Sequence, residues 1–347
     1  MTDRPHVPLR RDAWMQAVRW WPLALVMVFG SVQARDAQVA VCAAAQQVPV
    51  PAADTGTAPA GCDAQRLYAG ADGTGGDVVA ARHCAYRERA EDLHRTFGGS
   101  GLLMMLYANG DGVARDPALA RRFACEYGGA PAELRGRLSR IQGIADGNTG
   151  GWLDICDDVT SSAMAGSCTG RNAGFARVVR DRQWQTLQSD WTPVQRNAWQ
   201  TLRTAADGYF GRVGSEEIDL SGTSRGAFAI EARETLEMEL LDTFQRFERG
   251  ERPTQSAASL APLDRALNTT YREVRAELQA RPLLQGYDLF GTVNADGVRD
   301  TQRAWLRYRD AWVAFAATRW PDTAGDAWRA WLTDTRTAAL EAIRGGP

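Results

Sequence analysis

Three acidic residues lie close together in the segment GSEEIDLSGTSR, residues 214–225: Glu216, Glu217 and Asp219. Two carboxylates on either side of a glycosidic bond can hydrolyse it, one as the acid and the other as base or nucleophile. Acidic residues are equally common in loops before a helix, where Ser221 or Thr223 would be the N-cap. The segment therefore allows either a hydrolase site or a solvated helix cap.

Histidine and lysine, which serve many catalytic and metal sites, are almost absent. The 40 basic residues are all Arg, which excludes Schiff-base and phosphate-binding lysines. Of the three histidines, His83 and His94 are three helical turns apart and cannot chelate one ion on a straight helix. These absences argue against a histidine triad and a multi-histidine metal site, and we predict no metal and no cofactor.

The stretch TQRAWLRYRDAWVAF, residues 301–315, places arginines among aromatic residues. Such a mixture is typical of nucleic-acid binding. The net charge of −2, however, provides no basic surplus for a polyanion. Trp305, Tyr308, Trp312 and Phe315 recur every three or four residues and share one helix face. The pattern indicates a core helix with a solvated back and no nucleic-acid partner.

The N-terminus has the features of a secretory signal peptide. The apolar run at residues 20–30 follows Arg10, Arg11 and Arg19, and Val32 and Ala34 precede the expected cleavage site. The run is too short to span a membrane. We predict a signal peptide over residues 1–34, with Met1 or Met15 as the start, and a periplasmic or secreted product. No stable membrane anchor is expected after cleavage, which leaves 36 Arg and 40 acidic residues.

Six cysteines, all in the first half of the chain, fit an oxidising compartment and three disulfides. The sequence allows fifteen connectivities. The simplest pairing joins neighbours: Cys42 to Cys62, Cys84 to Cys125, and Cys156 to Cys168.

Helical periodicity dominates after residue 66, so the predicted fold class is all-α. Residues 35–65 are rich in Ala and Pro and are expected to form a loosely ordered leader. Expected helices span about 79–94, 132–143, 170–188, 192–210, 224–249, 260–280, 301–316 and 324–344.

The segment YANGDGVARDPALARRFACEY, residues 107–127, predicts a helix, a glycine turn and a second helix. Gly110 and Gly112 suit positive φ angles, and Asp116 before Pro117 is typical of an N-cap. The segment resembles the Sel-like repeat, a relative of the tetratricopeptide repeat. The matching positions are Leu106, Tyr107, Gly110, Gly112, Val113, Asp116, Ala120 and Phe123. The resemblance implies a short helical-repeat region over residues 66–150 that binds other proteins, or one that is only a folding unit.

The C-terminal segments LDRALNTTYREVRAEL, residues 263–278, and TQRAWLRYRD resemble the lysozyme inhibitor LprI family. The matching positions are Asp264, Leu267, Asn268, Tyr271, Gln302, Arg303, Trp305, Leu306, Arg309 and Asp310. A looser match, carried by Met164 and Cys168, begins at Cys156. We therefore predict two small helical bundles, a degenerate unit over 151–252 and an LprI-like domain over 253–347.

The resemblance implies an exported, non-catalytic cell-envelope protein whose partner is a protein, a lysozyme for this family. Its candidate binding residues are Asn268, Tyr271, Gln302, Arg309 and Asp310. The same residues could instead form hydrogen bonds between helices, including an ion pair between Arg309 and Asp264. An interaction scaffold of the Sel-like type is the alternative function, and a hydrolase that uses Glu216 and Glu217 is the third.

Overall fold

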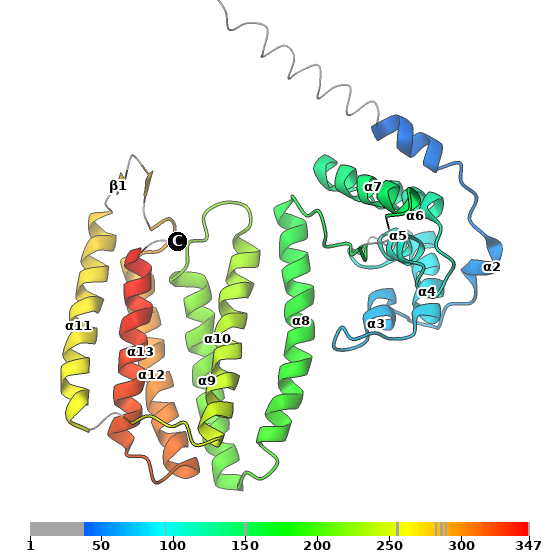
Figure 1. The fold of residues 1–347 in the computed structure, drawn as a ribbon. Helices are drawn as coiled ribbons and strands as arrows, with labels where there is room; N and C mark the ends of the chain where they lie inside the picture. Colours follow the sequence, from blue (N-terminus) through cyan, green and yellow to red (C-terminus); the bar gives the residue numbers. More distant parts are fainter. Residues whose placement is uncertain are drawn as a thin grey trace, which may run out of the picture.

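The computed structural model describes residues 38–93, 95–148, 151–254, 257–281, 283–284, 287–288 and 290–345, and these residues are mostly helical (Figure 1). The predicted all-α class is confirmed. Two short strands, β1 (Leu283–Leu284) and β2 (Tyr287–Asp288), pair as an antiparallel hairpin. The predicted signal peptide over residues 1–34, with both possible start sites, lies outside the described residues, as does His94. No helix within the described ranges is long and apolar enough to cross a membrane.

The N-terminal part of the fold is a group of short helices around their own hydrophobic core. These are α2 (Ala52–Thr55), α3 (Ala64–Ala69), α4 (Val78–Ala90), α5 (Gly99–Asn109), α6 (Pro117–Tyr127) and α7 (Pro131–Ala145). Helix α5 is buried along its whole length because it is surrounded by α3, α4 and α6.

The turn between α5 and α6 has the geometry that its glycines and aspartate predict. Gly110 ends α5 with φ of 72° and Gly112 follows with φ of 62°, angles that favour glycine. The Asp116 carboxylate accepts hydrogen bonds from the backbone N–H of Ala118 and Leu119 at the start of α6. The Tyr107 and Phe123 rings stack with centroids 5.6 Å apart. The local helix pair is present, while its assignment as a Sel-like repeat stays a prediction.

Two of the three predicted disulfide pairs are wrong. Cys42 is bonded to Cys125 and Cys62 to Cys84, whereas Cys156 is bonded to Cys168 as the sequence suggested. Neighbour pairing fails because residues 38–63 run back over α6 and α4, which carry Cys125 and Cys84.

The segment expected to be a loose leader is therefore packed against the helices. Residues 38–45 are helical, and Arg122 of α6 donates a hydrogen bond to the Gln46 carbonyl at 2.9 Å. The Tyr107 hydroxyl donates to the Asp54 carboxylate at 2.8 Å. These contacts and two disulfides hold the described part of residues 35–65 on the N-terminal core.

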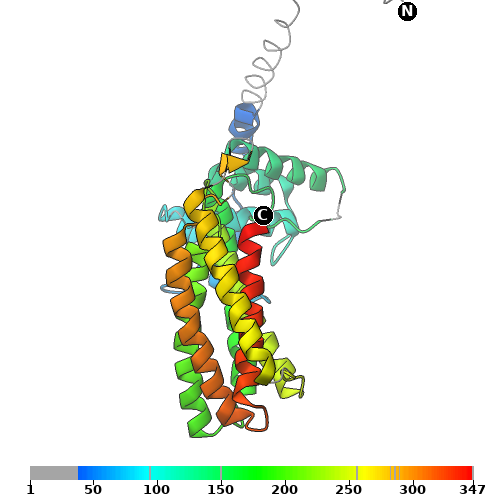
Figure 2. The ribbon, with the colours of Figure 1, turned by 90° about the vertical axis from the view of Figure 1, so that its left-hand side faces the viewer.

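The C-terminal part is a bundle of long helices (Figures 1 and 2). They are α8 (Ser162–Leu187), α9 (Pro193–Glu216), α10 (Arg225–Glu248), α11 (Ala257–Ala280), α12 (Ala295–Arg319) and α13 (Gly325–Gly345). Helix α9 begins with a capping box in which Thr192 and Gln195 bond each other's backbone N–H groups.

The two predicted bundles share one hydrophobic core. Helix α9 of the first unit lies beside α12 of the second, where Tyr209 stacks on Tyr308 with centroids 5.3 Å apart. Phe244 of α10 stacks on Trp312 at 4.7 Å. The aromatic face of residues 301–315 is buried in this core, as the sequence analysis predicted.

Each half of the bundle has the same neighbour pattern. Helix α10 packs against α8 and α9, and α13 packs against α11 and α12. This correspondence supports an internal duplication, which remains a prediction. Helix α8 also joins the two cores, because Cys168 near its start is bonded to Cys156 and Trp184 near its end lies in the bundle.

Candidate functional site

The predicted residue Asn268 lies on the exposed side of α11, and Tyr271, at the edge of that side, is partly buried and packs against the bundle core. Leu267, Val274 and Leu278 are buried on the opposite side and fix the helix on the bundle. Arg265, Asn268, Thr269, Tyr271 and Arg272 line a surface hollow of about 610 Å³. We call this group the α11 stripe.

The polar groups of the α11 stripe are largely open to a partner. Asn268 donates from Nδ2 to the Asp264 carbonyl at 2.8 Å, and Arg272 donates from Nε to the Asn268 carbonyl at 2.9 Å. Within the described ranges, Arg265 forms no side-chain hydrogen bond or ion pair, and Arg272 forms no ion pair with a carboxylate. The stripe therefore presents two exposed guanidinium groups two helical turns apart.

The predicted residue Gln302 belongs to a different, buried group. Its Oε1 accepts a hydrogen bond from Arg336 Nε at 2.9 Å. Arg336 NH1 also donates to Glu217 Oε2 at 2.7 Å and to the Tyr209 hydroxyl at 3.3 Å. Burial opposes the charge of Arg336, but the facing Glu217 carboxylate raises its pKa overall. Gln302, which is half-buried, therefore helps to join α9, α12 and α13.

This arrangement gives no support to a hydrolase site at residues 216–219. Glu217 is held by Arg336, and hydrogen bonds from Ser221 lower the pKa of Asp219. A glycosidase acid needs a raised pKa and a second carboxylate across an open cleft. The segment is a structured helix end, although the N-cap of α10 is Ser224 in place of the expected Ser221 or Thr223.

The predicted residues Arg309 and Asp310 pair with each other on α12. Arg309 NH2 lies 3.2 Å from Asp310 Oδ1, and its guanidinium lies 5.2 Å from the Trp305 ring centroid. The suggested Arg309–Asp264 pair is wrong, because Asp264 accepts from the Thr333 hydroxyl instead. The Arg309 guanidinium therefore covers the buried indole of Trp305. The five predicted residues lie in three separate places: on α11, beside Arg336, and on the Arg309–Asp310 side of α12.

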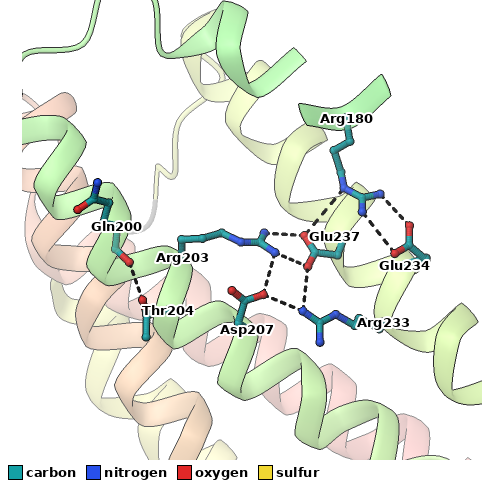
Figure 3. Close-up of polar contacts among 8 residues, drawn as sticks. All are labelled: Arg180, Gln200, Arg203, Thr204, Asp207, Arg233, Glu234 and Glu237. Carbon is teal, nitrogen blue, oxygen red and sulfur yellow. Dashed lines mark hydrogen bonds and ion pairs between the residues drawn. The ribbon is translucent and has the colours of Figure 1, made fainter. Parts of the chain in front are cut away.

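An ion-pair network that the sequence analysis did not predict connects α8, α9 and α10 (Figure 3). Arg180 of α8 donates to Glu234 at 2.8 Å, and Arg203 of α9 donates to Glu237 at 2.6 Å. Asp207 accepts from both Arg203 and Arg233 at 2.8 Å. The Arg203–Asp207 spacing of four residues was a visible signal, but the contacts across helices were not.

The same network lines a cavity of about 620 Å³ together with Trp184 and Trp199. Its carboxylates Glu234, Glu237 and Asp207 are all engaged by arginines. The network is therefore suited to holding α8 on the bundle, and the α11 stripe remains the more accessible polar surface.

Comparison with known proteins gives one family match. The family model described as Lysozyme inhibitor LprI matches residues 250–340, which include α11, α12 and most of α13. All five predicted binding residues lie in this range. No curated protein and no solved structure matches the chain.

Proposed function

We propose that the protein is an exported, non-catalytic binding protein of the cell envelope that inhibits a lysozyme. The observation that carries the proposal is the LprI match over residues 250–340. The three disulfides support export, because such bonds persist in oxidising compartments. A periplasmic or secreted location would place the protein where it meets lysozymes.

The α11 stripe is the surface that we assign to the lysozyme. A lysozyme cuts its glycan with two carboxyl groups in a cleft. A guanidinium group matches the geometry of a carboxylate and can bind it through two parallel hydrogen bonds. Arg265 and Arg272 are exposed on a helix that is fixed by its buried face, so they are positioned before the partner arrives.

The charge of the whole chain favours the same partner. With the signal peptide removed, the chain has 36 Arg and 40 acidic residues, so it is weakly acidic. Lysozymes of the vertebrate type are basic, and opposite net charges accelerate association. The arginines of the α11 stripe then bind the carboxylates in the cleft of the lysozyme, although the lysozyme as a whole is basic.

A turbidity assay of cell walls treated with lysozyme tests the proposal. The exported chain should slow clearing, and the double variant Arg265→Glu/Arg272→Glu should weaken inhibition at least about tenfold, since like charges would face the cleft. The matched control is Arg307→Glu, an equally exposed arginine on α12. Clearing at the uninhibited rate with the unchanged protein would refute the function. Equal inhibition by the double variant would refute the assigned surface.

The interaction-scaffold alternative draws support from the α5–α6 helix pair with its Tyr107–Phe123 stack. However, residues 46–48 lie against α6 through the hydrogen bonds of Arg122, so the protein's own chain covers part of that pair. A scaffold function would have to use another face. It is the remaining interpretation if lysozyme activity is unaffected.

A further inference from the structure

A cavity of about 750 Å³ lies between the N-terminal helices and the first half of α8, far in sequence from the α11 stripe. Its volume is within the range of small-ligand sites, about 300–1,000 Å³. Four aromatic side chains line it: Tyr68, Phe97, Trp152 and Phe175. Trp152 is 57 % exposed, whereas the described tryptophans of the C-terminal bundle are largely buried. The cavity therefore has an aromatic platform that the described residues leave more than half exposed.

Apart from one paired arginine, the polar side chains around the cavity are neutral or acidic. The Asp111 carboxylate lies beside the Tyr68 hydroxyl, and burial together with the charge of Asp111 raises the pKa of Tyr68. The phenol thus stays protonated and can donate a hydrogen bond. Arg171 is the basic residue of the lining, but it is paired with Asp154 at 2.9 Å and lies over the Phe97 ring. No guanidinium in this lining is left to attract an anion.

One wall of the cavity is backbone from the glycine-rich segment of residues 70–76. Gly73 has φ of 80°, and a Cβ atom there would lie 2.8 Å from the Phe175 ring. A Cβ atom at Gly76 would lie 2.1 Å from the Leu67 carbonyl oxygen. The absence of a side chain at Gly73 allows the segment to approach Phe175 closely, and at Gly76 it allows close approach to the Leu67 carbonyl.

We propose that this cavity binds a neutral glycan strand, the polysaccharide of the cell wall. The apolar C–H faces of sugar rings can pack on the Trp152 and Tyr68 rings, while hydroxyl groups can bond Asp111 and Gln65. The acidic lining disfavours a phosphate-rich ligand, and the polar rim disfavours a lipid chain. The proposal rests on the exported location in the proposed function, but not on lysozyme inhibition.

Glycan binding at this place would concentrate the inhibitor where its target works. A lysozyme acts on the wall glycan, so a protein bound to the same strands meets it at a high effective concentration. The cavity is lined by α3, α4, α5, α8 and the loops between them, whereas the stripe lies on α11, so the two surfaces can be tested separately.

The test measures binding of the exported chain to purified wall sacculi by co-sedimentation, and to N-acetylglucosamine hexasaccharide by calorimetry, without lysozyme. Trp152→Ala should weaken hexasaccharide binding at least about tenfold, because it removes the open stacking face. The matched control is Phe228→Ala on α10, which removes an aromatic ring that is 45 % exposed outside the cavity. Far-UV circular dichroism should be the same for all three proteins.

Three results would overturn the glycan site: no binding of the unchanged protein to either probe, equal affinity of Trp152→Ala, or binding to sacculi with none to the hexasaccharide, which carries no stem peptide. The last result would indicate a peptide ligand instead. Arg265→Glu/Arg272→Glu should retain full glycan binding. Loss of lysozyme inhibition with intact glycan binding, or the reverse, therefore identifies which proposal has failed.

Discussion

Arg336 is 1 % exposed, and its guanidinium faces the Glu217 carboxylate and the Gln302 amide inside the bundle. The two charged residues are 119 positions apart, at the end of α9 and in the middle of α13. Removing one partner of such a pair leaves a buried charge without compensation. The buried contacts among Arg336, Glu217 and Gln302 therefore stabilise the packing of α9, α12 and α13.

Replacing Glu217 by Gln should lower the free energy of unfolding by about 3 kcal/mol, since Arg336 would remain buried and charged. Urea unfolding followed by tryptophan fluorescence measures this effect. Glu216→Gln is the control, because within the described residues the Glu216 carboxylate accepts a side-chain hydrogen bond from Ser215 alone and forms no ion pair. Equal midpoints for the two variants would show that the ion pair contributes little.

Glu133 gives the N-terminal core a dependence on pH. Burial alone would raise its pKa, but hydrogen bonds from Ser161, Thr160 and Ala130 lower it overall. A carboxyl group with a depressed pKa stabilises the fold above its unfolded pKa of about 4.3. That contribution is lost as the pH falls through the lower, folded value.

Thermal unfolding between pH 7 and pH 3 should show this loss. Glu133→Gln should unfold at a lower temperature than the unchanged protein at pH 7, and its midpoint should fall less on acidification. Glu91→Gln, at a half-exposed position of the surface, should behave like the unchanged protein. Parallel pH profiles for Glu133→Gln and the unchanged protein would contradict the assignment.

Residue types could be predicted from the sequence more readily than their partners. The aromatic face of residues 301–315 followed from its spacing, and its burial is confirmed. The partners of Gln302 and Arg309 could not be predicted, because Arg336 and Glu217 are brought together only by the packing of distant helices. Arg265 and Arg272, which we propose as lysozyme contacts, were missed because exposed arginines on a helix have no local signal.

At the scale of a single element, one capping residue determines where helix α6 begins. Asp116 accepts from two backbone N–H groups, and Pro117 occupies the first helical position. The beginning of α6 was therefore predictable from the sequence. Helices α8 and α12 begin earlier than expected, because the caps Ser161 and Asn294 precede segments without a clear apolar period.

Asp116→Ala should destabilise the N-terminal core by about 1 kcal/mol, the usual cost of losing an N-cap. Asp116→Asn should be almost neutral, because an amide oxygen can accept the same hydrogen bonds. Hydrogen exchange of the α6 amides measures the effect directly. If both variants exchange at the rate of the unchanged protein, the cap does not contribute to the stability of α6.

At the scale of the whole molecule, the fold has two hydrophobic cores with different chemistry. The N-terminal core contains all three disulfides, and the C-terminal core contains most of the tryptophans. The sequence analysis placed all six cysteines in the first half of the chain and predicted an aromatic core helix at residues 301–315. It did not predict that both C-terminal units share one core, since contacts between α9 and α12 depend on how the two halves face each other.

A reducing agent should therefore destabilise one core and spare the other. The Cys42–Cys125 bond spans 83 residues, and the chain-entropy estimate for its removal is about 4–5 kcal/mol. With reductant, far-UV circular dichroism should show an early partial loss of helix, while the tryptophan fluorescence transition stays in place. Cys42→Ser/Cys125→Ser should reproduce the early loss without reductant. A common shift of both signals would show that the cores unfold as one unit.

The nesting of these bonds has a mechanical consequence. The Cys62–Cys84 bond lies inside the loop closed by Cys42–Cys125, so tension applied along the chain passes directly through the outer bond. The 83 residues between these cysteines cannot be stretched while the bond is intact. The stretched chain is therefore shorter by about 270–300 Å than it would be without the bond. Under shear, an oxidised molecule held at a surface would yield in its C-terminal bundle and keep its N-terminal end short and stiff.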